Sequence, residues 1–288
     1  MSAPDWASDG RDWPNRDASR FVVSGGVRWH VQVAGSGPVV LLLHGTGASS
    51  HSWRDVLPVL AERFTVVIPD LPGHGFTSRL TSPTLPAMAR QVAGLLGTLG
   101  LTPALVVGHS AGAAVALRLS LDVAAVPVVG FGAALLPFPG VAARLFPTLA
   151  KLLFVNPLVP SIMAAQARTP GVVARFLPRA TGSTIDARGV ELYARLFARS
   201  GHVAGALAMM ANWDLAALKA DFGQIAAPVR LLHGDRDATV PVDAAREAAR
   251  LIPGAEPRIL ADLGHLAHEE DAGGAATAIL AAANDWGV

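Results

Sequence analysis

The chain has 288 residues, and its composition excludes several classes of protein. It carries 23 basic and 22 acidic residues without a basic tail, so nothing points to a nucleic-acid partner. It contains no cysteine, which excludes disulfides, thiolate metal sites and cysteine nucleophiles. Apolar residues make up 51% of the chain, enough to bury a large core.

The sequence shows no segment that would place the protein in or across a membrane. The first twenty residues carry charges of both signs and lack the apolar run of an export signal. The apolar stretch at 123–136 is too short to span a bilayer, and the one at 152–165 is interrupted by prolines. We therefore expect a soluble, cytoplasmic protein, with peripheral contact to the inner membrane left open.

Short apolar runs and helical segments alternate along most of the chain. The runs VVLLL, TVVIP and ALVVG do not alternate with polar residues, which is typical of parallel strands covered on both faces. Strands are predicted at residues 21–24, 27–34, 39–44, 65–70, 104–108, 126–131, 229–233 and 257–261. Helices are predicted at residues 53–63, 86–99, 111–121, 242–251 and 275–284. This order predicts an α/β fold with an eight-stranded, mostly parallel sheet flanked by helices.

The alternation stops after about residue 131 and resumes at 229. Residues 133–212 are helical in pattern, punctuated by prolines and very apolar, which predicts a helical cap inserted into a core of residues 1–132 and 213–288. The predicted cap holds eight basic and two acidic residues, a charge of about +6, against about −5 for the rest of the chain.

The strongest motif is GHSAG at residues 108–112. It follows a predicted strand and precedes a predicted helix, which is the context of a G-x-S-x-G nucleophile elbow. In such a turn the helix N-terminus behind Ser110 favours developing negative charge. The alternative, a chance Gly-Ser-Gly turn, is disfavoured by the strand before it and the helix after it.

A nucleophilic serine needs a base that a third group orients. Asp237 lies in the turn after the strand VRLLHG, and His265 follows the strand PRIL, so both lie just past strand ends. The spacing G-x-x-D-x-x-V-P favours Asp237 as the acid, with Asp235 as the alternative. His268 is expected to be a neighbour of His265, and because no third ligand lies nearby in the sequence, no metal is expected.

The segment HGTG at residues 44–47 follows the strand VVLLL. Its glycines let the backbone approach a substrate closely. In this arrangement the oxyanion is held by one amide from this loop and one from the residue after the nucleophile, here Thr46 and Ala111. Removing one such donor costs about 3 kcal/mol of transition-state stabilisation. The alternative is an ordinary glycine turn, which the strand context disfavours.

Together with DLPGHG at residues 70–75, these motifs resemble the α/β-hydrolase superfamily in order and spacing from about residue 20 onward. A narrower resemblance includes the N-terminal arm and the end of the cap. The segments DGRDWPNRDASRFV, LLLHGTGASSHSWRDVLPVL, DLPGHGFT, GHSAGAAVALRLSL and AGALAMMANWDL are similar to the BchO family, described as magnesium-chelatase accessory proteins of bacteriochlorophyll synthesis. This resemblance implies a role in a pathway and a contact with magnesium chelatase, and it does not imply a reaction.

An apolar cap with basic residues suits a large hydrophobic substrate bearing carboxylates, such as a porphyrin ester, or docking on an anionic membrane surface. The alternative is a solvated basic face over an ordinary cap core. Four apolar side chains are expected to line the substrate pocket, with burial in the core as the alternative for the last three: Trp53, Met209, Met210 and Trp213.

The reaction expected from these residues is cleavage of hydrophobic carboxylic esters through an acyl-enzyme on Ser110, without a cofactor. Because this framework hosts several chemistries, C–C bond hydrolases, cofactor-free haloperoxidases and lactonases remain alternatives. A different class is a non-catalytic accessory protein that binds a tetrapyrrole or magnesium chelatase. The complete Ser110, Asp237 and His265 set argues against that class.

Overall fold

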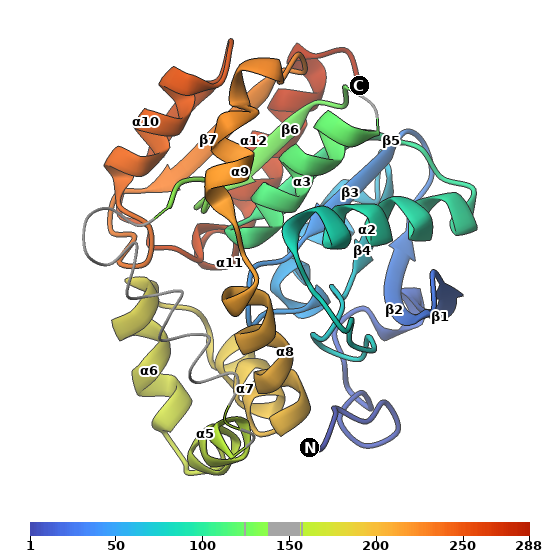
Figure 1. The fold of residues 1–288 in the computed structure, drawn as a ribbon, viewed down its shortest axis with the longest axis vertical. Coiled ribbons are helices and arrows are strands. Elements are labelled where there is room, and N and C mark those ends of the chain that lie inside the picture. Colours follow the sequence, from blue (N-terminus) through green and yellow to red (C-terminus); the bar gives the residue numbers. More distant parts are fainter. Residues whose placement is uncertain (124, 138–155, 157) are drawn as a thin grey trace.

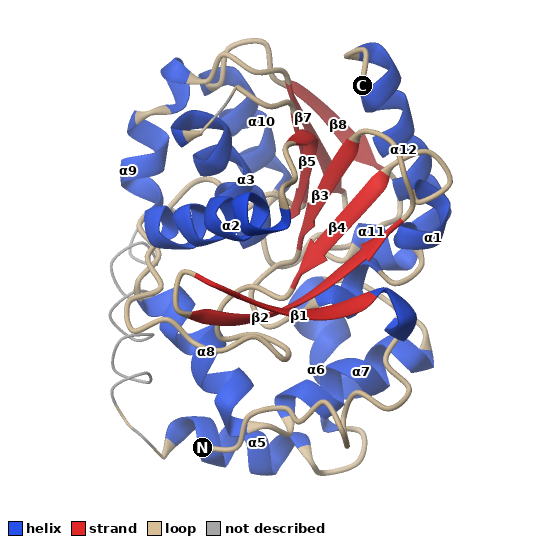
Figure 2. Cartoon of the chain, turned by 90° about the vertical axis from the view of Figure 1, so that its right-hand side faces the viewer, coloured by secondary structure: helices blue, strands red, loops and turns tan. Residues whose placement is uncertain are grey.

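One sheet with helices on both of its faces forms the centre of the protein (Figures 1 and 2). The structure is a computed structural model that describes residues 1–123, 125–137, 156 and 158–288. The strand order is β1-β2-β4-β3-β5-β6-β7-β8, so the predicted eight-stranded sheet is confirmed. The strands are β1 (Ser19–Ser24), β2 (Val27–Ala34), β3 (Val39–Leu43), β4 (Thr65–Pro69), β5 (Pro103–His109), β6 (Val128–Phe131), β7 (Val229–Gly234) and β8 (Glu256–Leu260).

The sheet is parallel except at one edge. β2 pairs antiparallel with both β1 and β4, and every pairing from β4 to β8 is parallel. The carboxyl ends of the six parallel strands therefore meet at one edge, where an open α/β sheet presents its functional groups.

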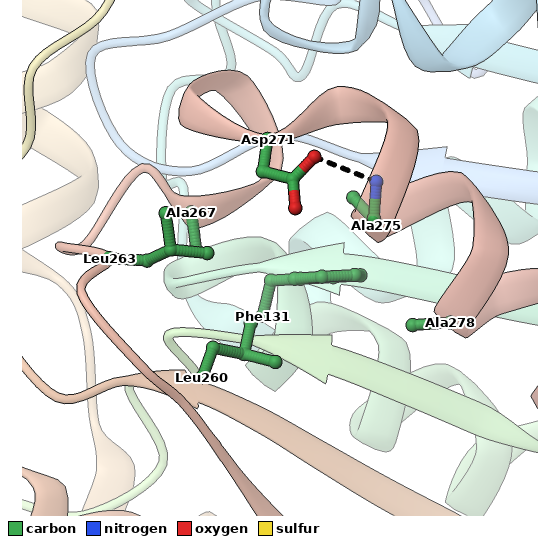
Figure 3. A pocket seen from close by; sticks show the side chains of 8 residues that line it. Phe131, Leu260, Leu263, Ala267, Asp271, Ala275 and Ala278 are labelled. Atoms are coloured by element: carbon green, nitrogen blue, oxygen red, sulfur yellow. Dashed lines mark hydrogen bonds between the residues drawn. The ribbon is translucent and has the colours of Figure 1, made fainter.

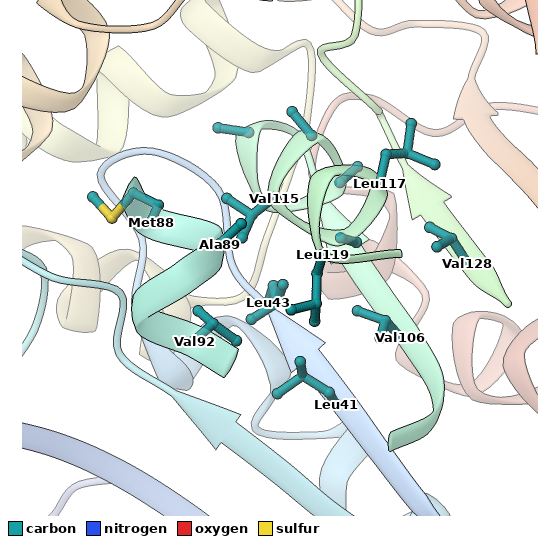
Figure 4. Close-up of a cluster of buried hydrophobic side chains, with 14 of the residues drawn as sticks. Leu41, Leu43, Met88, Ala89, Val92, Val106, Val115, Leu117, Leu119 and Val128 are labelled. Atoms are coloured by element: carbon teal, nitrogen blue, oxygen red, sulfur yellow. The ribbon is translucent and has the colours of Figure 1, made fainter. Parts of the chain in front are cut away.

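Helices cover both faces of the sheet, which explains the uninterrupted apolar strands. In β3, Leu41 and Leu43 face one helical layer while Val40 and Leu42 face the other. The first layer contains α2 (Leu85–Leu99), α3 (Ala111–Asp122), α9 (Leu215–Ala220) and α10 (Val242–Leu251), and Figure 4 shows part of its core. The second contains α1 (Val56–Leu60) and α12 (Ala272–Asp285), with α11 (Ala267–Glu270) leading into α12.

Two predicted helices differ from the structure by more than one residue at an end. The segment predicted as helix 53–63 forms a 3-10 turn, η2 (Ser50–Trp53), followed by the short helix α1. Because proline lacks an N–H and is tolerated only in a first helical turn, Pro58 permits a helix that starts near residue 56. The last helix starts three residues earlier than predicted, since the Asp271 carboxylate accepts the Gly274 N–H and caps it.

The helical insertion between β6 and β7 is present, and its described helices lie beyond the carboxyl edge of the sheet (Figure 1). They are α5 (Val159–Ala167), α6 (Val172–Thr181), α7 (Ala187–Phe197) and α8 (Ser200–Ala211). Residues 138–155 and 157 of the predicted cap lie outside the described residues. Within the described part of the chain, no helix combines the length and apolar character needed to cross a bilayer.

The N-terminal arm joins the cap to the core. Its Asp12 carboxylate pairs with Arg188 and Arg195 of α7, each at 2.6 Å, and Asp9 pairs with Arg199 at the start of α8. On the core side, Trp13 Nε1 donates to the Ser50 hydroxyl. Three of the basic residues noted in the cap are therefore partners of this arm.

A buried ion pair also links cap and core. The Arg54 guanidinium bonds the Glu269 carboxylate at 2.8 Å, and the Tyr193 hydroxyl of α7 donates to the same carboxylate at 2.7 Å. Burial raises the pKa of Glu269 to about 7, and the adjacent guanidinium opposes that shift. Cap, core and the segment after His265 thus share one buried polar cluster.

Candidate active site

Ser110 occupies a sharp turn between β5 and α3. Its backbone has φ 52° and ψ −116°, a conformation that costs a residue with a side chain about 1–3 kcal/mol. The flanking glycines explain how the turn closes: a Cβ on Gly108 would lie 2.4 Å from the backbone of Ala113, and one on Gly112 would lie 2.4 Å from the Leu43 oxygen. Positions 108 and 112, two residues either side of Ser110, therefore have no room for a side chain.

Asp237 and His265 form a hydrogen-bonded pair. Asp237 Oδ2 lies 2.7 Å from His265 Nδ1, while its Oδ1 accepts the N–H groups of Thr239 and Val240, both at 2.8 Å. The Asp237 side chain is fully buried, whereas Asp235 is exposed. Because Nδ1 is engaged by the carboxylate, the other ring nitrogen, Nε2, is left to exchange a proton in the cavity that both His265 and Ser110 line.

Thr46 and Ala111 line the same cavity as Ser110. Neither of their N–H groups has an acceptor among the described residues, and Ala111 opens helix α3. Gly45 allows this close approach, since a Cβ there would lie 3.0 Å from the Ser110 Cβ. Two unpartnered amides beside a serine can hold an oxyanion.

His44 fixes the loop that carries Thr46. Its Nδ1 donates to the Gly45 oxygen at 2.8 Å, and its Nε2 accepts the Leu71 N–H at 2.8 Å, which requires a neutral ring. Burial lowers the pKa of His44, consistent with that state. The motif alone did not reveal this supporting role.

A cavity of about 770 Å³ lies between the cap and the carboxyl edge of the sheet. Its wall is mainly apolar and includes Val172, Phe176, Leu177, Phe197 and Leu207 from the cap. No arginine or lysine within the described ranges lines it, so the expectation that cap arginines bind substrate carboxylates is not supported.

The four predicted pocket residues divide into two pairs. Met210 and Trp213 line the cavity. Met209 is fully buried below it, where its sulfur accepts the Thr46 hydroxyl at 3.5 Å, and Trp53 is buried on the other face of the sheet against Phe131. The expected substrate contacts of Trp53 and Met209 are therefore not supported, because both side chains point into the core.

His109 and His268 pack beside the pair of Asp237 and His265. The His109 ring centroid lies 4.7 Å from that of His265 and 4.4 Å from that of His268. Burial lowers the pKa of both His109 and His268 well below its usual value, so both rings are neutral. His268 is thus a packing neighbour, as expected, and the described residues hold no cluster of three groups suited to a metal.

A second cavity lies away from this site, between the sheet and α12 (Figure 3). Its volume is about 70 Å³, and Phe131, Leu260 and Ala278 line it. The space suits a few water molecules at most, and Asp271, the one titratable residue among those that line it, caps helix α12 through the Gly274 N–H. We therefore assign it no function.

His202 of α8 ties the cap to the loop of Thr46. Its Nε2 donates to the Gly47 oxygen at 2.9 Å, and its Nδ1 accepts the Gly75 N–H at 3.0 Å. Burial lowers the pKa of His202 from 6.5 to about 4. The ring is therefore neutral in the folded protein at pH values where the unfolded chain already binds a proton.

This shift predicts a pH-dependent stability. Because the folded pKa is below the unfolded one, the contribution of His202 is complete above pH 6.5 and is lost as the pH falls toward 4. We expect the free energy of unfolding to fall by about 2 kcal/mol more in wild type than in His202→Gln when the pH is lowered from 7 to 5. Urea unfolding at both pH values measures this difference, and equal losses in the two proteins would contradict it.

The comparisons with known proteins agree with this geometry. The model of the alpha/beta hydrolase family matches residues 40–278. The chain is 43% identical to the magnesium-chelatase 30 kDa subunit of Rhodobacter capsulatus, over 96% of both proteins, which confirms the narrower resemblance. A soluble epoxide hydrolase of a Corynebacterium species is 42% identical over about a third of each chain (34%).

Solved structures share the fold at low sequence identity. The epoxide hydrolase CorEH superposes with a TM-score of 0.79 at 23% identity, covering 93% of this chain and 98% of that one. An esterase from Thermogutta terrifontis gives a TM-score of 0.73 at 23% identity, again over 93% and 98% of the two chains. With the sheet order, the helical insertion and the family match in agreement, the chain belongs to the alpha/beta hydrolase family.

Proposed function

We propose that this protein is a serine hydrolase that cleaves hydrophobic carboxylic esters. The observation that supports this most is the 2.7 Å hydrogen bond from Asp237 to His265, whose ring lines the same cavity as Ser110 at its strained turn. The strain favours a catalytic role, since residues in such backbone conformations cluster at active sites.

The proposed reaction has two halves. Ser110 Oγ attacks the ester carbonyl while His265 Nε2 takes the hydroxyl proton, and the imidazolium then returns that proton to the leaving alcohol. Water gives a proton to the same nitrogen and attacks the acyl-enzyme; the bond to Ser110 Oγ then breaks, and the imidazolium returns the proton to Oγ as the acid leaves. The Asp237 carboxylate holds the ring through Nδ1, and the amides of Thr46 and Ala111 stabilise each oxyanion.

A serine-reactive fluorophosphonate tests the nucleophile and its acid. We expect wild type to be labelled and Ser110→Ala to be unlabelled. Labelling of Asp237→Asn should be about 10⁴-fold slower than that of wild type, because the amide leaves His265 in the wrong tautomer. Asp235→Asn is the matched control, since this carboxylate is exposed and should leave the rate unchanged. In-gel fluorescence of the folded proteins gives the rates. Labelling that survives Ser110→Ala would exclude this nucleophile.

The cavity wall supports a hydrophobic substrate. Met210, Trp213 and Phe176 offer apolar surface, and each methylene transferred from water to such a surface gains about 0.8 kcal/mol. We expect kcat/KM for p-nitrophenyl esters to rise about fourfold per acyl methylene until the cavity is full. A stopped assay with acyl chains of increasing length measures this series. Turnover of a dienone-type diketone without any ester turnover would instead favour a C–C bond hydrolase, and a preference for lactones would favour a lactonase.

A second candidate is a role in tetrapyrrole metabolism, favoured by the 43% identity to the magnesium-chelatase subunit. A volume of about 770 Å³ lies within the range that holds large organic ligands. In the same assay, a porphyrin methyl ester hydrolysed by wild type and not by Ser110→Ala supports an esterase acting on a pigment precursor. Binding without hydrolysis, equal in both proteins, supports an accessory protein that presents a tetrapyrrole to magnesium chelatase.

The rim of the cavity also supports peripheral contact with an anionic membrane surface. Met163 and Phe176 are exposed apolar residues that line the cavity, and Ile162, the neighbour of Met163 in α5, is also exposed. Arg175 and Arg179 of α6 are exposed and form no ion pair with any residue that the structure describes. Basic and apolar groups side by side favour binding to anionic lipid.

Vesicle sedimentation tests this contact. We expect wild type to bind vesicles that contain anionic lipid, with weaker binding at high salt because the arginine contribution is screened. Ile162→Ser should reduce binding, whereas Leu251→Ser, a change at another exposed apolar residue, on α10, should not. Equal binding to neutral and anionic vesicles, or none to either, would contradict this proposal.

A further inference from the structure

The end of cap helix α6 contacts both loops that carry the proposed acid and base. The Thr181 carbonyl accepts the N–H of His265 at 2.8 Å and that of Ala238 at 3.3 Å. In addition, the Thr239 hydroxyl donates a hydrogen bond to the Ala180 carbonyl at 2.8 Å. The loop of Asp237 and the loop of His265 therefore meet on one turn of the cap.

The backbone around His265 is fixed by three consecutive amides. The Gly264 N–H donates to Glu270 Oε2 at 2.6 Å, the His265 N–H to the Thr181 carbonyl, and the Leu266 N–H to the Ser183 hydroxyl at 2.8 Å. Three fixed amides leave this peptide segment little freedom to rotate, so the position of the imidazole depends on their acceptors.

Glu270 connects these acceptors to one another. Besides Gly264, its carboxylate accepts the Ser183 hydroxyl at 2.7 Å and the Thr184 N–H at 2.7 Å. The Ser183 hydroxyl thus donates to Glu270 while it accepts from Leu266. One carboxylate therefore holds both the cap segment 183–184 and the segment that carries His265.

The two segments are in direct backbone contact. A Cβ on Gly264 would lie 2.5 Å from the carbonyl carbon of Gly182, and a Cβ on Gly182 would lie 2.0 Å from the Arg236 oxygen in the loop of Asp237. Gly182 also has φ +70°, which closes α6 in the left-handed region. Since neither glycine can accept a side chain without movement of the backbone, small displacements of the cap are transmitted to His265.

We propose that Glu270, acting through Ser183, is a positioning residue that sets the place of His265 relative to Ser110. This proposal rests on the proposed hydrolase function. Glu270 does not line the 770 Å³ cavity, so it acts on the rate of the chemical step and not on substrate binding. A misplacement of a reacting group by about 1 Å can reduce a rate about 100-fold.

The variants Glu270→Gln, Glu270→Ala and Ser183→Ala test this role. The carboxamide of Glu270→Gln keeps the shape of the side chain but places an NH₂ donor where the carboxylate accepts hydrogen bonds, so at least one acceptor is lost. Glu62→Gln is the matched control, because this glutamate is exposed and precedes the amino end of β4, whereas the site lies at the carboxyl edge of the sheet.

We expect kcat for a p-nitrophenyl ester to fall about 10-fold to 100-fold in Glu270→Gln and Ser183→Ala, with KM changed less than twofold. The kcat of Glu270→Ala should fall further, and the kcat of Glu62→Gln should equal that of wild type. Urea midpoints show whether each variant is folded under assay conditions. Each kcat is then calculated per site that reacts with fluorophosphonate, so that unfolded protein is not counted. An unchanged corrected kcat in Glu270→Gln and Ser183→Ala, or a loss confined to KM, would overturn the positioning role.

A readout without substrate separates this proposal from the proposed function. The proton on His265 Nδ1, hydrogen-bonded to Asp237, should give a downfield NMR resonance that Asp237→Asn removes. We expect Glu270→Gln to shift or broaden this resonance and Glu62→Gln to leave it in place. If wild type hydrolyses no ester, the proposed function fails while this shift still supports the positioning of His265. If the resonance stays in place in folded Glu270→Gln, the positioning role fails.

Discussion

The close approach of strand β5 to helix α3 is the constraint on which the rest of the site depends. It requires Gly108, since a Cβ there would overlap the backbone of Ala113. Gly112 likewise lets α3 approach the end of β3, where a Cβ would overlap the Leu43 oxygen, and Ser110 between the two glycines has φ 52°. Because β3, β5, β7 and β8 are parallel, the groups that follow their carboxyl ends come to the same edge as Ser110. The position of the candidate active site therefore follows from the shared direction of these strands and from the turn at Ser110.

The cap is as much a part of the site as the sheet. His202 of α8 bonds the loop of Thr46, and the end of α6 bonds the segment of His265. The N-terminal arm, through Asp12, bonds α7. The loop of Thr46 and the segment of His265 are therefore both bonded to helices of the insertion, and the same helices also line the cavity.

The sequence predicted the features that depend on local pattern. The eight strands in a mostly parallel sheet, the turn at Ser110 and the residues after β7 and β8 follow from short motifs whose spacing determines their geometry. In the structure Ser110 and His265 line one cavity, and Asp237 is hydrogen-bonded to His265. Features that depend on packing between distant segments could not be predicted. Met209 and Met210 are neighbours, and only the packing of α8 decides which one faces the cavity.

The charge of the cap was the least informative sequence signal about the binding site. The excess of arginine in the cap suggested a binding surface for carboxylates, yet Arg188 and Arg195 pair with Asp12 across more than 170 residues of chain. The contacts of Glu270 with Ser183 and Thr184 likewise join segments about 86 residues apart. Nothing in a linear motif records such partners, because they depend on where the cap helices end.

A structure of the protein after reaction with a fluorophosphonate tests the central claim most directly. The account predicts a covalent bond from phosphorus to Ser110 Oγ, with the phosphoryl oxygen within hydrogen-bond distance of the N–H groups of Thr46 and Ala111. It also predicts that His265 Nε2 faces the bonded oxygen and that the alkyl chain lies against Met210 and Trp213. An adduct on another residue, or a phosphoryl oxygen directed away from both amides, would contradict it.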